Sequence, residues 1–334
     1  MIRFHDDTTR QSPRRTWMAQ VASIFLILSC TFVTYVALVE HDTFGCVGTC
    51  SPVAATKQDI KILPSFENGG VIFFLHVPKT GGVSVRSALQ EGKGQYILSD
   101  RMVKFKKFQP KINRAVKYGT HGKLLIFELH AADSPTLMEV AATLNEWRST
   151  ARLNNVPFFT FSIVREPMSM AVSFFNFYNG MDHHDSHYTY YEDPSEQDFV
   201  DNLVFNPQCG FLAKSDHLFY NKTLQQFLTR EECEAAYTTL HSEMDWVGST
   251  DTLTSETFPL LRRLISTNTE ADFLAPENLK PKNKSPSKIR QEDLTSTTVE
   301  LVHKMTRWDQ VLYEKAKRDY PYSSVQVRRE GAFH

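Results

Sequence analysis

Three continuous apolar runs, each followed by a segment of helical character, dominate the first half of the chain. The runs cover residues 71–76, 124–129 and 158–164. Apolar runs of this length without polar alternation are typical of strands buried on both faces of a parallel sheet. Because parallel strands need crossover connections, which are usually helices, the pattern predicts right-handed βαβ units.

Helices are expected directly after each apolar run. The first covers about 83–89, the second runs from an N-cap at Ser134 to about Trp147, and the third begins at Pro167. The later chain is mainly helical, with apolar residues at helical intervals near the carboxyl end. We therefore expect an α/β fold with a central parallel sheet flanked by helices, in one domain over residues 69–322.

A long uncharged segment precedes this domain. Residues 16–39 contain no charged side chain and consist mostly of apolar residues and small hydroxyl residues. As a helix at about 1.5 Å per residue, the segment would span about 36 Å, enough for a hydrocarbon core of about 30 Å. A cleaved signal peptide is the alternative, but its apolar region is normally about 7–15 residues long. The sequence therefore predicts an uncleaved N-terminal transmembrane helix that acts as a signal anchor.

The charges that flank the anchor predict its orientation. Four arginines precede it, and two acidic residues follow it closely. Because positive charge favours the cytosolic side, the tail 1–15 is expected in the cytosol, and the stem 40–68, the domain and the C-terminal tail 323–334 in the lumen. This single-pass type II arrangement is typical of Golgi membrane enzymes. The glycosylation sequons at Asn221 and Asn283 are in keeping with a lumenal glycoprotein.

Composition excludes some functional classes. The 334 residues include 37 Lys and Arg against 38 Asp and Glu, and the formal net charge of −1 gives no field that would favour nucleic acid. Five cysteines are too few for a disulfide scaffold, and pairing of Cys46 with Cys50 and of Cys209 with Cys233 is one possibility among several. No metal is expected, since the histidines of 183–187 lie among polar loop residues without a cysteine partner.

The first apolar run leads into a loop with the sequence HVPKTGGVS over residues 76–84. Gly81 and Gly82 let the backbone approach an anion closely, and the start of the next helix offers unpaired N–H groups and the positive end of its dipole. Lys79 adds a point charge, and the hydroxyls of Thr80 and Ser84 add donors. Because the lysine precedes the glycine pair, the loop is not a Walker A motif. The loop is interpreted as a phosphate site, and a tight turn with an exposed lysine is the alternative.

A second candidate for anion binding follows the third apolar run, in the sequence REPMSMAVS over residues 165–173. The Arg165 guanidinium can present two donors to a phosphate, and Ser173 lies about two helical turns later. The alternative is an ion pair between Arg165 and a nearby carboxylate such as that of Glu166. Two such elements at the ends of neighbouring strands indicate a ligand with two separated phosphate groups.

Together, HVPKTGG-x-S and R-x-P-x₅-S resemble the motifs of the membrane-bound carbohydrate sulfotransferases, especially the heparan sulfate 6-O- and uronyl 2-O-sulfotransferases. The resemblance covers about residues 70–320 and implies a P-loop-like sulfotransferase fold with 3′-phosphoadenosine 5′-phosphosulfate as co-substrate. It implies that the first loop binds the 5′-phosphosulfate and that the second element binds the 3′-phosphate. The residues for the first role are Lys79, Thr80, Gly81, Gly82, Val83 and Ser84, and those for the second are Arg165 and Ser173. The family often has an arginine where this chain has Met170.

Sulfuryl transfer to a sugar hydroxyl needs a base for the hydroxyl proton, and histidine titrates near lumenal pH. His130 follows the second apolar run, where a parallel sheet presents its carboxyl edge. The stretch 129–133, Leu-His-Ala-Ala-Asp, also resembles the segment that carries the proposed base of the 6-O-sulfotransferases. His130 is therefore the predicted base, His121 and Glu128 remain alternatives, and Lys79 is expected to stabilise charge on the departing phosphate.

A basic segment follows the first helix. Residues 101–123 contain eight Lys and Arg and no acidic residue. In a nearly neutral chain, this concentration of charge predicts a groove for an acidic glycan, with Lys104, Lys106 and Lys107 as contacts and aromatic residues such as Phe105 stacking on sugar faces. A solvated helical surface is the alternative.

The sequence thus predicts a Golgi sulfotransferase that modifies a hydroxyl of a glycosaminoglycan-like or other acidic glycan. A catalytically inactive glycan-binding Golgi protein that keeps the fold is the alternative. A metal-dependent glycosyltransferase is disfavoured, because the sequence has no Asp-x-Asp motif. The identity of the sugar, the position of its hydroxyl and the oligomeric state are left open.

Overall fold

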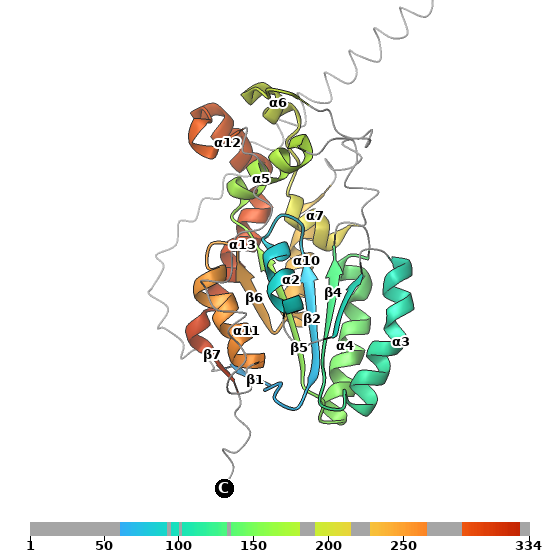
Figure 1. The fold of residues 1–334 in the computed structure, drawn as a ribbon. Coiled ribbons are helices and arrows are strands. Elements are labelled where there is room, and N and C mark those ends of the chain that lie inside the picture. The colour runs from blue at the N-terminus through green and yellow to red at the C-terminus, as the bar shows by residue number, and fades with distance from the viewer. Residues whose placement is uncertain are drawn as a thin grey trace, which may run out of the picture. The chain divides into compact units, whose positions relative to one another are not determined.

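The computed structural model describes residues 61–91, 95–99, 102–131, 135–180, 191–214, 228–265 and 289–327 (Figure 1). Five parallel strands form the main sheet, in the spatial order β3-β4-β2-β5-β6. These strands are β2 (Gly70–His76), β3 (Gln95–Ser99), β4 (Leu124–His130), β5 (Phe158–Val164) and β6 (Trp246–Ser249). The expected α/β architecture with a central parallel sheet is confirmed.

The three apolar runs form the three central strands of the sheet. Every residue of β2 and of β5 is buried, as expected for strands that are covered on both faces. The sequence analysis missed the edge strands, because β3 mixes buried residues with half-exposed ones and β6 has only four residues. Strands this short and this mixed carry no clear hydrophobic period.

Helices flank the sheet and supply most of the connections between strands. Those before β5 are α2 (Gly82–Glu91), α3 (Met102–Tyr118) and α4 (Leu137–Leu153). Those after β5 are α5 (Pro167–Gly180), α6 (Glu196–Asp201), α7 (Pro207–Ala213), α10 (Arg230–Glu243), α11 (Phe258–Ile265), α12 (Ser296–Met305) and α13 (Arg307–Asp319). Figure 1 shows α3 and α4 side by side at the β3–β4 half of the sheet, and α3 packs on both β2 and β3.

The predicted helix starts are right at Pro167 and wrong for α4. The N-cap of α4 is Thr136, not Ser134, and the helix runs past Trp147 to Leu153. Thr136 and Glu139 form a capping box, in which each side chain accepts the backbone N–H of the other residue. Two satisfied N–H groups explain why the helix begins at this threonine.

A cluster of aromatic rings fills the core between the sheet and the helices α3 and α4. Its rings are those of Phe73 of β2, Phe127 of β4, Phe105 of α3 and Trp147 of α4. Phe127 and Trp147 each contact the other three rings, with centroids 5.8 to 6.3 Å apart. Phe105 is only 4% exposed. The expectation that Phe105 stacks on a sugar face is therefore wrong, because its ring belongs to the core.

Residues near both ends of the described chain form a second, two-stranded parallel sheet. It pairs β1 (Lys61–Leu63) with β7 (Val325–Val327). These strands lie in the predicted stem 40–68 and in the predicted C-terminal tail 323–334, so regular structure begins before residue 69 and continues beyond residue 322.

The predicted anchor 16–39 and both sequons lie outside the described residues. Within the described ranges, no helix has the length and apolar character required to cross a membrane.

Candidate active site

The direction of chain winding reverses between β2 and β5. After β2 the chain forms β3 and β4, which lie between β2 and one lateral edge of the sheet. After β5 it forms β6, which is the strand at the other lateral edge. In open parallel sheets, ligands bind at the carboxyl ends of the strands that flank such a switch point. The loop 77–81 follows β2 and Arg165 follows β5, so both predicted phosphate-binding elements lie there.

The loop after β2 is held in shape by threonine hydroxyls. Thr80 is fully buried, and its Oγ1 donates to the Val77 carbonyl over 2.7 Å. This bond corrects the expectation that the Thr80 hydroxyl donates to an anion, because its proton is committed to the loop. Thr250, just beyond β6, donates from Oγ1 to the Thr80 carbonyl over 2.9 Å. Lys79 and Gly81 both have positive φ, 64° and 85°, so the backbone turns sharply at this point.

The helix α2 begins at Gly82, directly against the ring of His76. A Cβ on Gly82 would lie 2.0 Å from His76 Cδ2 and 2.1 Å from Nε2, so only glycine fits. In the first turn, the N–H groups of Gly82 and Val83 have no helical acceptors, whereas the Ser84 N–H donates to the Gly81 carbonyl over 3.0 Å. No acidic residue lies in this turn. Val83 and Ser84, also in this turn, are half-buried. The start of α2 can therefore bind an anion through its backbone.

Lys79 places a cation beside this helix start. Its Nζ lies 3.8 Å from the centroid of the Phe177 ring on α5, which is a close cation–π contact. Burial, together with the nearby charge of Arg165, lowers the pKa of Lys79 to about 8. Because an anion would offset both effects, the site favours a negatively charged ligand.

Arg165 joins the two predicted elements. Its Nη1 donates to the Lys79 carbonyl over 2.9 Å, and its Nε donates to Ser169 Oγ over 2.9 Å. Glu166 does not form the alternative ion pair with Arg165, although the structure describes both residues. Its carboxylate instead accepts the backbone N–H groups of Met168 and Ser169 and thereby caps α5. Burial lowers the pKa of Arg165, as expected for a cation with no carboxylate partner in direct contact.

Ser173, the second predicted 3′-phosphate ligand, and Met170, which stands where the family often has an arginine, both lie on α5. Ser173 is half-buried and lies about one turn beyond Ser169. Met170 is fully buried in the core, so this position supplies no cation to the site. An anion near α5 therefore depends on Arg165 and on side-chain hydroxyls, since Glu166 already satisfies N–H groups at the helix start.

A buried network lies beneath the loop and was not predicted from the sequence. Glu128 of β4 is fully buried and accepts hydrogen bonds from His76 Nδ1 (2.6 Å), from Arg86 of α2 and from the Tyr96 hydroxyl. Burial alone would raise the pKa of Glu128, but the hydrogen bonds from Arg86 and His76 hold it at about 2. A carboxylate that is ionised and occupied by three donors is a poor base, which argues against the Glu128 alternative.

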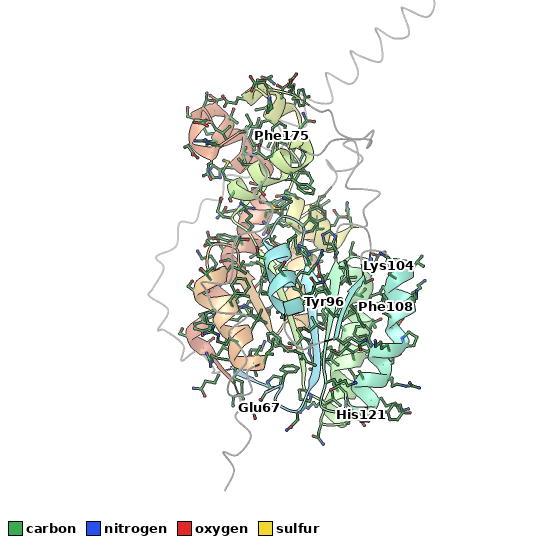
Figure 2. The ribbon with its side chains drawn as sticks, viewed as in Figure 1. Glu67, Tyr96, Lys104, Phe108, His121 and Phe175 are labelled. Atoms are coloured by element: carbon green, nitrogen blue, oxygen red, sulfur yellow. The ribbon has the colours of Figure 1, made fainter. Side chains whose placement is uncertain are left out.

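His130 ends β4 in register with His76 of β2. The two imidazole rings are 4.5 Å apart and nearly perpendicular, and His130 is half-buried at the carboxyl edge of the sheet. His121 lies in the turn before β4, at the opposite edge (Figure 2). The length of a seven-residue strand, about 20 Å, separates His121 from the loop, so it cannot serve as the base there.

The basic segment 101–123 forms α3 and the turn after it. Lys104, Lys106 and Lys107 are exposed on the first turns of the helix. Figure 2 shows Lys104 at the end of α3 that lies toward the carboxyl edge of the sheet, away from His121. The three lysines therefore lie toward the same edge as the loop 77–81.

Cys209 and Cys233 are neighbours but form no disulfide. Both are buried free thiols, on α7 and α10, and burial together with the neighbouring Cys233 side chain raises the pKa of Cys209. The two cysteines of the suggested pair are therefore neighbours, but the predicted disulfide between them is absent. Cys46 and Cys50 lie outside the described residues, as do the histidines of 183–187. In the part of the chain that the structure covers, no group of three His, Cys, Asp or Glu side chains is arranged to hold a metal.

Comparison with known proteins gives a distant likeness among solved structures. No family model matches the sequence, and no curated protein matches it. Among solved structures, the chain is similar to a retinol dehydratase, described as in complex with androsterone and inactive cofactor PAP. The two share 12% sequence identity over 76% of this chain and 67% of the other, with a TM-score of 0.26. At this TM-score the likeness carries no argument, and the function below rests on the site itself.

Proposed function

We propose that this protein is a sulfotransferase that moves a sulfuryl group from 3′-phosphoadenosine 5′-phosphosulfate to a sugar hydroxyl. The observation that carries the proposal is the meeting of the loop 77–81 with Arg165 at the switch point of the sheet. Two cations and the start of α2 converge there, on elements 86 positions apart in the sequence. A ligand with two separate phosphate groups makes use of both elements.

The 5′-phosphosulfate would bind at the start of α2. The backbone N–H groups of Gly82 and Val83 would donate to it, Ser84 would donate from its hydroxyl because its N–H already bonds to the Gly81 carbonyl, and Lys79 would add its charge. Gly81 would let the backbone come close to the anion. The close contact between Gly82 and His76 fixes the start of α2 against the sheet, because the His76 ring fills the space that a Cβ on residue 82 would need. Thr80 would contribute its backbone N–H and not its hydroxyl.

The 3′-phosphate would bind Arg165 and Ser173. The Arg165 guanidinium has five N–H groups, of which two donate to Lys79 and Ser169, so three lack a partner among the described residues. The half-buried Ser173 hydroxyl would add another donor from α5.

In the reaction, His130 would accept the proton of the sugar hydroxyl as the new oxygen–sulfur bond forms. The bond between sulfur and the bridging phosphate oxygen breaks on the opposite side, and its electron pair stays on that oxygen. Lys79 and the N–H groups of α2 would stabilise the resulting negative charge. The products are the sulfated sugar and 3′-phosphoadenosine 5′-phosphate.

The acceptor and the cellular setting belong to the same proposal. The exposed Lys104, Lys106 and Lys107 support an acidic, glycosaminoglycan-like acceptor, because they lie toward the same edge of the sheet as the loop. The uncharged segment 16–39 and its flanking charges support a single-pass type II protein of the Golgi membrane with a lumenal catalytic domain.

Calorimetric titration of the full-length protein in detergent tests the ligand. 3′-Phosphoadenosine 5′-phosphate should bind at least about tenfold more tightly than AMP, which lacks the 3′-phosphate. Equal affinity for the two would refute the proposal. Incubation with the sulfur-labelled donor and a panel of glycans then identifies the acceptor, and tight nucleotide binding without transfer to any glycan would favour an inactive glycan-binding protein.

A further inference from the structure

The backbone of Arg165 is fixed by a side chain from outside the sheet. Gln208 of α7 accepts the Arg165 N–H at its Oε1 over 2.8 Å, and its Nε2 donates to the Arg165 carbonyl over 2.8 Å. The amide thus pairs with Arg165 as a neighbouring strand would, one residue beyond the end of β5. Gln208 is fully buried, so water does not compete for either bond.

Gln208 is itself held by a buried carboxylate. Asp309 of α13 is fully buried and accepts the N–H of Gln208 over 2.9 Å and that of Cys209 over 2.8 Å. In return, Asn206 Oδ1, at the start of α7, accepts the N–H groups of Trp308 and Asp309. Each helix start is therefore capped by a side chain from the other helix, which fixes α7 against α13.

The guanidinium of Arg165 is fixed at its other end by the Lys79 carbonyl and by Ser169. With the backbone held by Gln208, both ends of this residue are restrained before any ligand arrives. A long side chain loses rotamer entropy when it is immobilised, and a residue that is already ordered does not lose that entropy on binding.

We propose that Gln208 is a positioning residue for the 3′-phosphate, acting through Arg165. This inference rests on the proposed function, because it assumes that Arg165 binds that phosphate. Gln208 orders the Arg165 backbone so that the remaining N–H groups of the guanidinium face the proposed position of the 3′-phosphate. Loss of its two hydrogen bonds weakens the recognition of the 3′-phosphate and leaves the rest of the nucleotide site unchanged.

Asn176 offers a matched control within the same protein. Its side-chain amide also pairs with a backbone on both sides, donating to the Ile289 carbonyl over 2.7 Å and accepting the Ile289 N–H over 3.1 Å. Asn176 is 5% exposed, so the two amides have similar burial and the same bonding pattern. A purely structural effect of losing such a pair appears at both positions.

The test compares the affinities of full-length wild type, Gln208→Met, Gln208→Asn and Asn176→Leu for 3′-phosphoadenosine 5′-phosphate and for AMP. In both Gln208 variants the preference for the 3′-phosphorylated nucleotide should fall about tenfold, while the affinity for AMP changes less than about twofold. Asn176→Leu should keep the preference. Gln208→Asn retains an amide that is too short for both bonds, so it serves if Gln208→Met fails to fold.

Two failures are distinguishable. If wild type shows no preference for the 3′-phosphorylated nucleotide, the proposed function is wrong. If wild type shows it and a folded Gln208 variant keeps it within about twofold, the positioning role of Gln208 is wrong. An equal loss of preference in Asn176→Leu would also overturn that role, because the effect would then be a general one.

Discussion

The guanidinium of Arg165 donates a hydrogen bond to the backbone carbonyl of Lys79 over 2.9 Å. This bond links the residue after β5 to the loop after β2, so the two basic side chains belong to one site. The charge of Arg165 helps to lower the pKa of Lys79, so the two cations repel each other, and burial makes the repulsion stronger. An anionic ligand with two charged groups would remove that cost, which is the electrostatic basis of the proposed binding of a doubly phosphorylated nucleotide.

The pKa of about 8 for Lys79 predicts a pH dependence of nucleotide affinity. The nucleotide binds the protonated lysine, whereas the free protein loses this proton as the pH rises through about 8. Phosphate groups stay fully charged above pH 7, so the affinity of wild type should fall about tenfold between pH 7 and pH 9. Calorimetric titration with 3′-phosphoadenosine 5′-phosphate across this range measures the effect.

Lys79→Arg is the control for this pH dependence. Arginine stays protonated over the whole range, so the affinity of this variant should be nearly constant from pH 7 to pH 9. Lys79→Ala should bind weakly at both pH values. A fall in affinity of the same size in Lys79→Arg would assign the pH dependence to another group.

Gly82→Ala should abolish nucleotide binding. The new Cβ would lie about 2 Å from the ring of His76, a buried side chain that hydrogen-bonds to Glu128 and cannot move away freely. Either the start of α2 or the His76 ring must shift, and we expect a loss of affinity of at least about 100-fold.

Gly119→Ala is the matched substitution. Gly119 has φ of 80°, and a Cβ there would meet nothing within 4 Å, so the change costs only backbone strain of about 1 kcal/mol. Thermal unfolding of both variants is the check that each is folded. If Gly82→Ala keeps the nucleotide affinity of Gly119→Ala, the start of α2 is not the binding position.

The central sheet and the outline of the site follow from local sequence patterns. The apolar runs predict β2, β4 and β5, and the residues just after a strand in a parallel sheet lie at one edge. Lys79 and Arg165 each follow such a strand, so their proximity can be predicted from the order of the strands and helices alone. The sequence marks Gly82 as part of a glycine pair in a tight loop. Only the three-dimensional structure shows that the His76 ring is the neighbour that leaves no room for a Cβ there.

The supporting residues do not follow from the sequence, because their partners are distant along the chain. Gln208 lies 43 positions from Arg165, and Asp309 lies 101 positions from Gln208. A buried Gln or Asp in a helical segment has no local signature that separates it from an exposed one. Glu128 is a partial exception, since a single acidic residue inside an apolar run predicts a buried partner, here Arg86.

The network around Glu128 predicts how stability depends on pH. Its pKa lies at about 2, below the ordinary value of 4.5, so the ionised carboxylate stabilises the folded state. This stabilisation is fully present above pH 4.5 and is lost as the pH falls toward 2. Glu128→Gln should therefore lower the free energy of unfolding by about 3 kcal/mol at pH 7, and the difference from wild type should shrink between pH 4.5 and pH 2.5. Denaturant unfolding at several pH values measures it.

Glu234→Gln serves as the control for this network. Glu234 pairs with Arg230 at 2.8 Å on the surface of α10, where both side chains are nearly half exposed. Such a pair contributes at most about 0.5 kcal/mol. A difference between wild type and Glu128→Gln that stays constant from pH 7 to pH 2.5 would contradict the assignment of an ionised, stabilising Glu128.

The role of His130 predicts a separation of binding from catalysis. His130→Ala should reduce the rate of sulfuryl transfer by about 10²- to 10⁴-fold, the usual contribution of a general base, and leave the affinity for 3′-phosphoadenosine 5′-phosphate within about twofold of wild type. His121→Ala, at the opposite edge of the sheet, should retain both properties. A rate for His130→Ala above about one tenth of wild type would remove His130 from the mechanism.

Charge reversal on α3 separates acceptor binding from a merely solvated surface. Lys106→Glu with Lys107→Glu changes the exposed first turns of the helix, and Lys111→Glu with Lys117→Glu makes the same change in net charge farther along it. With a sulfated, uronate-containing oligosaccharide at low salt, the first pair should raise the KM for the acceptor about tenfold at a nearly unchanged kcat. The second pair should raise it much less, because these lysines lie farther from the carboxyl edge of the sheet. Equal effects of the two pairs would mean that only the overall charge of α3 matters, and no effect of either would show that the acceptor binds elsewhere.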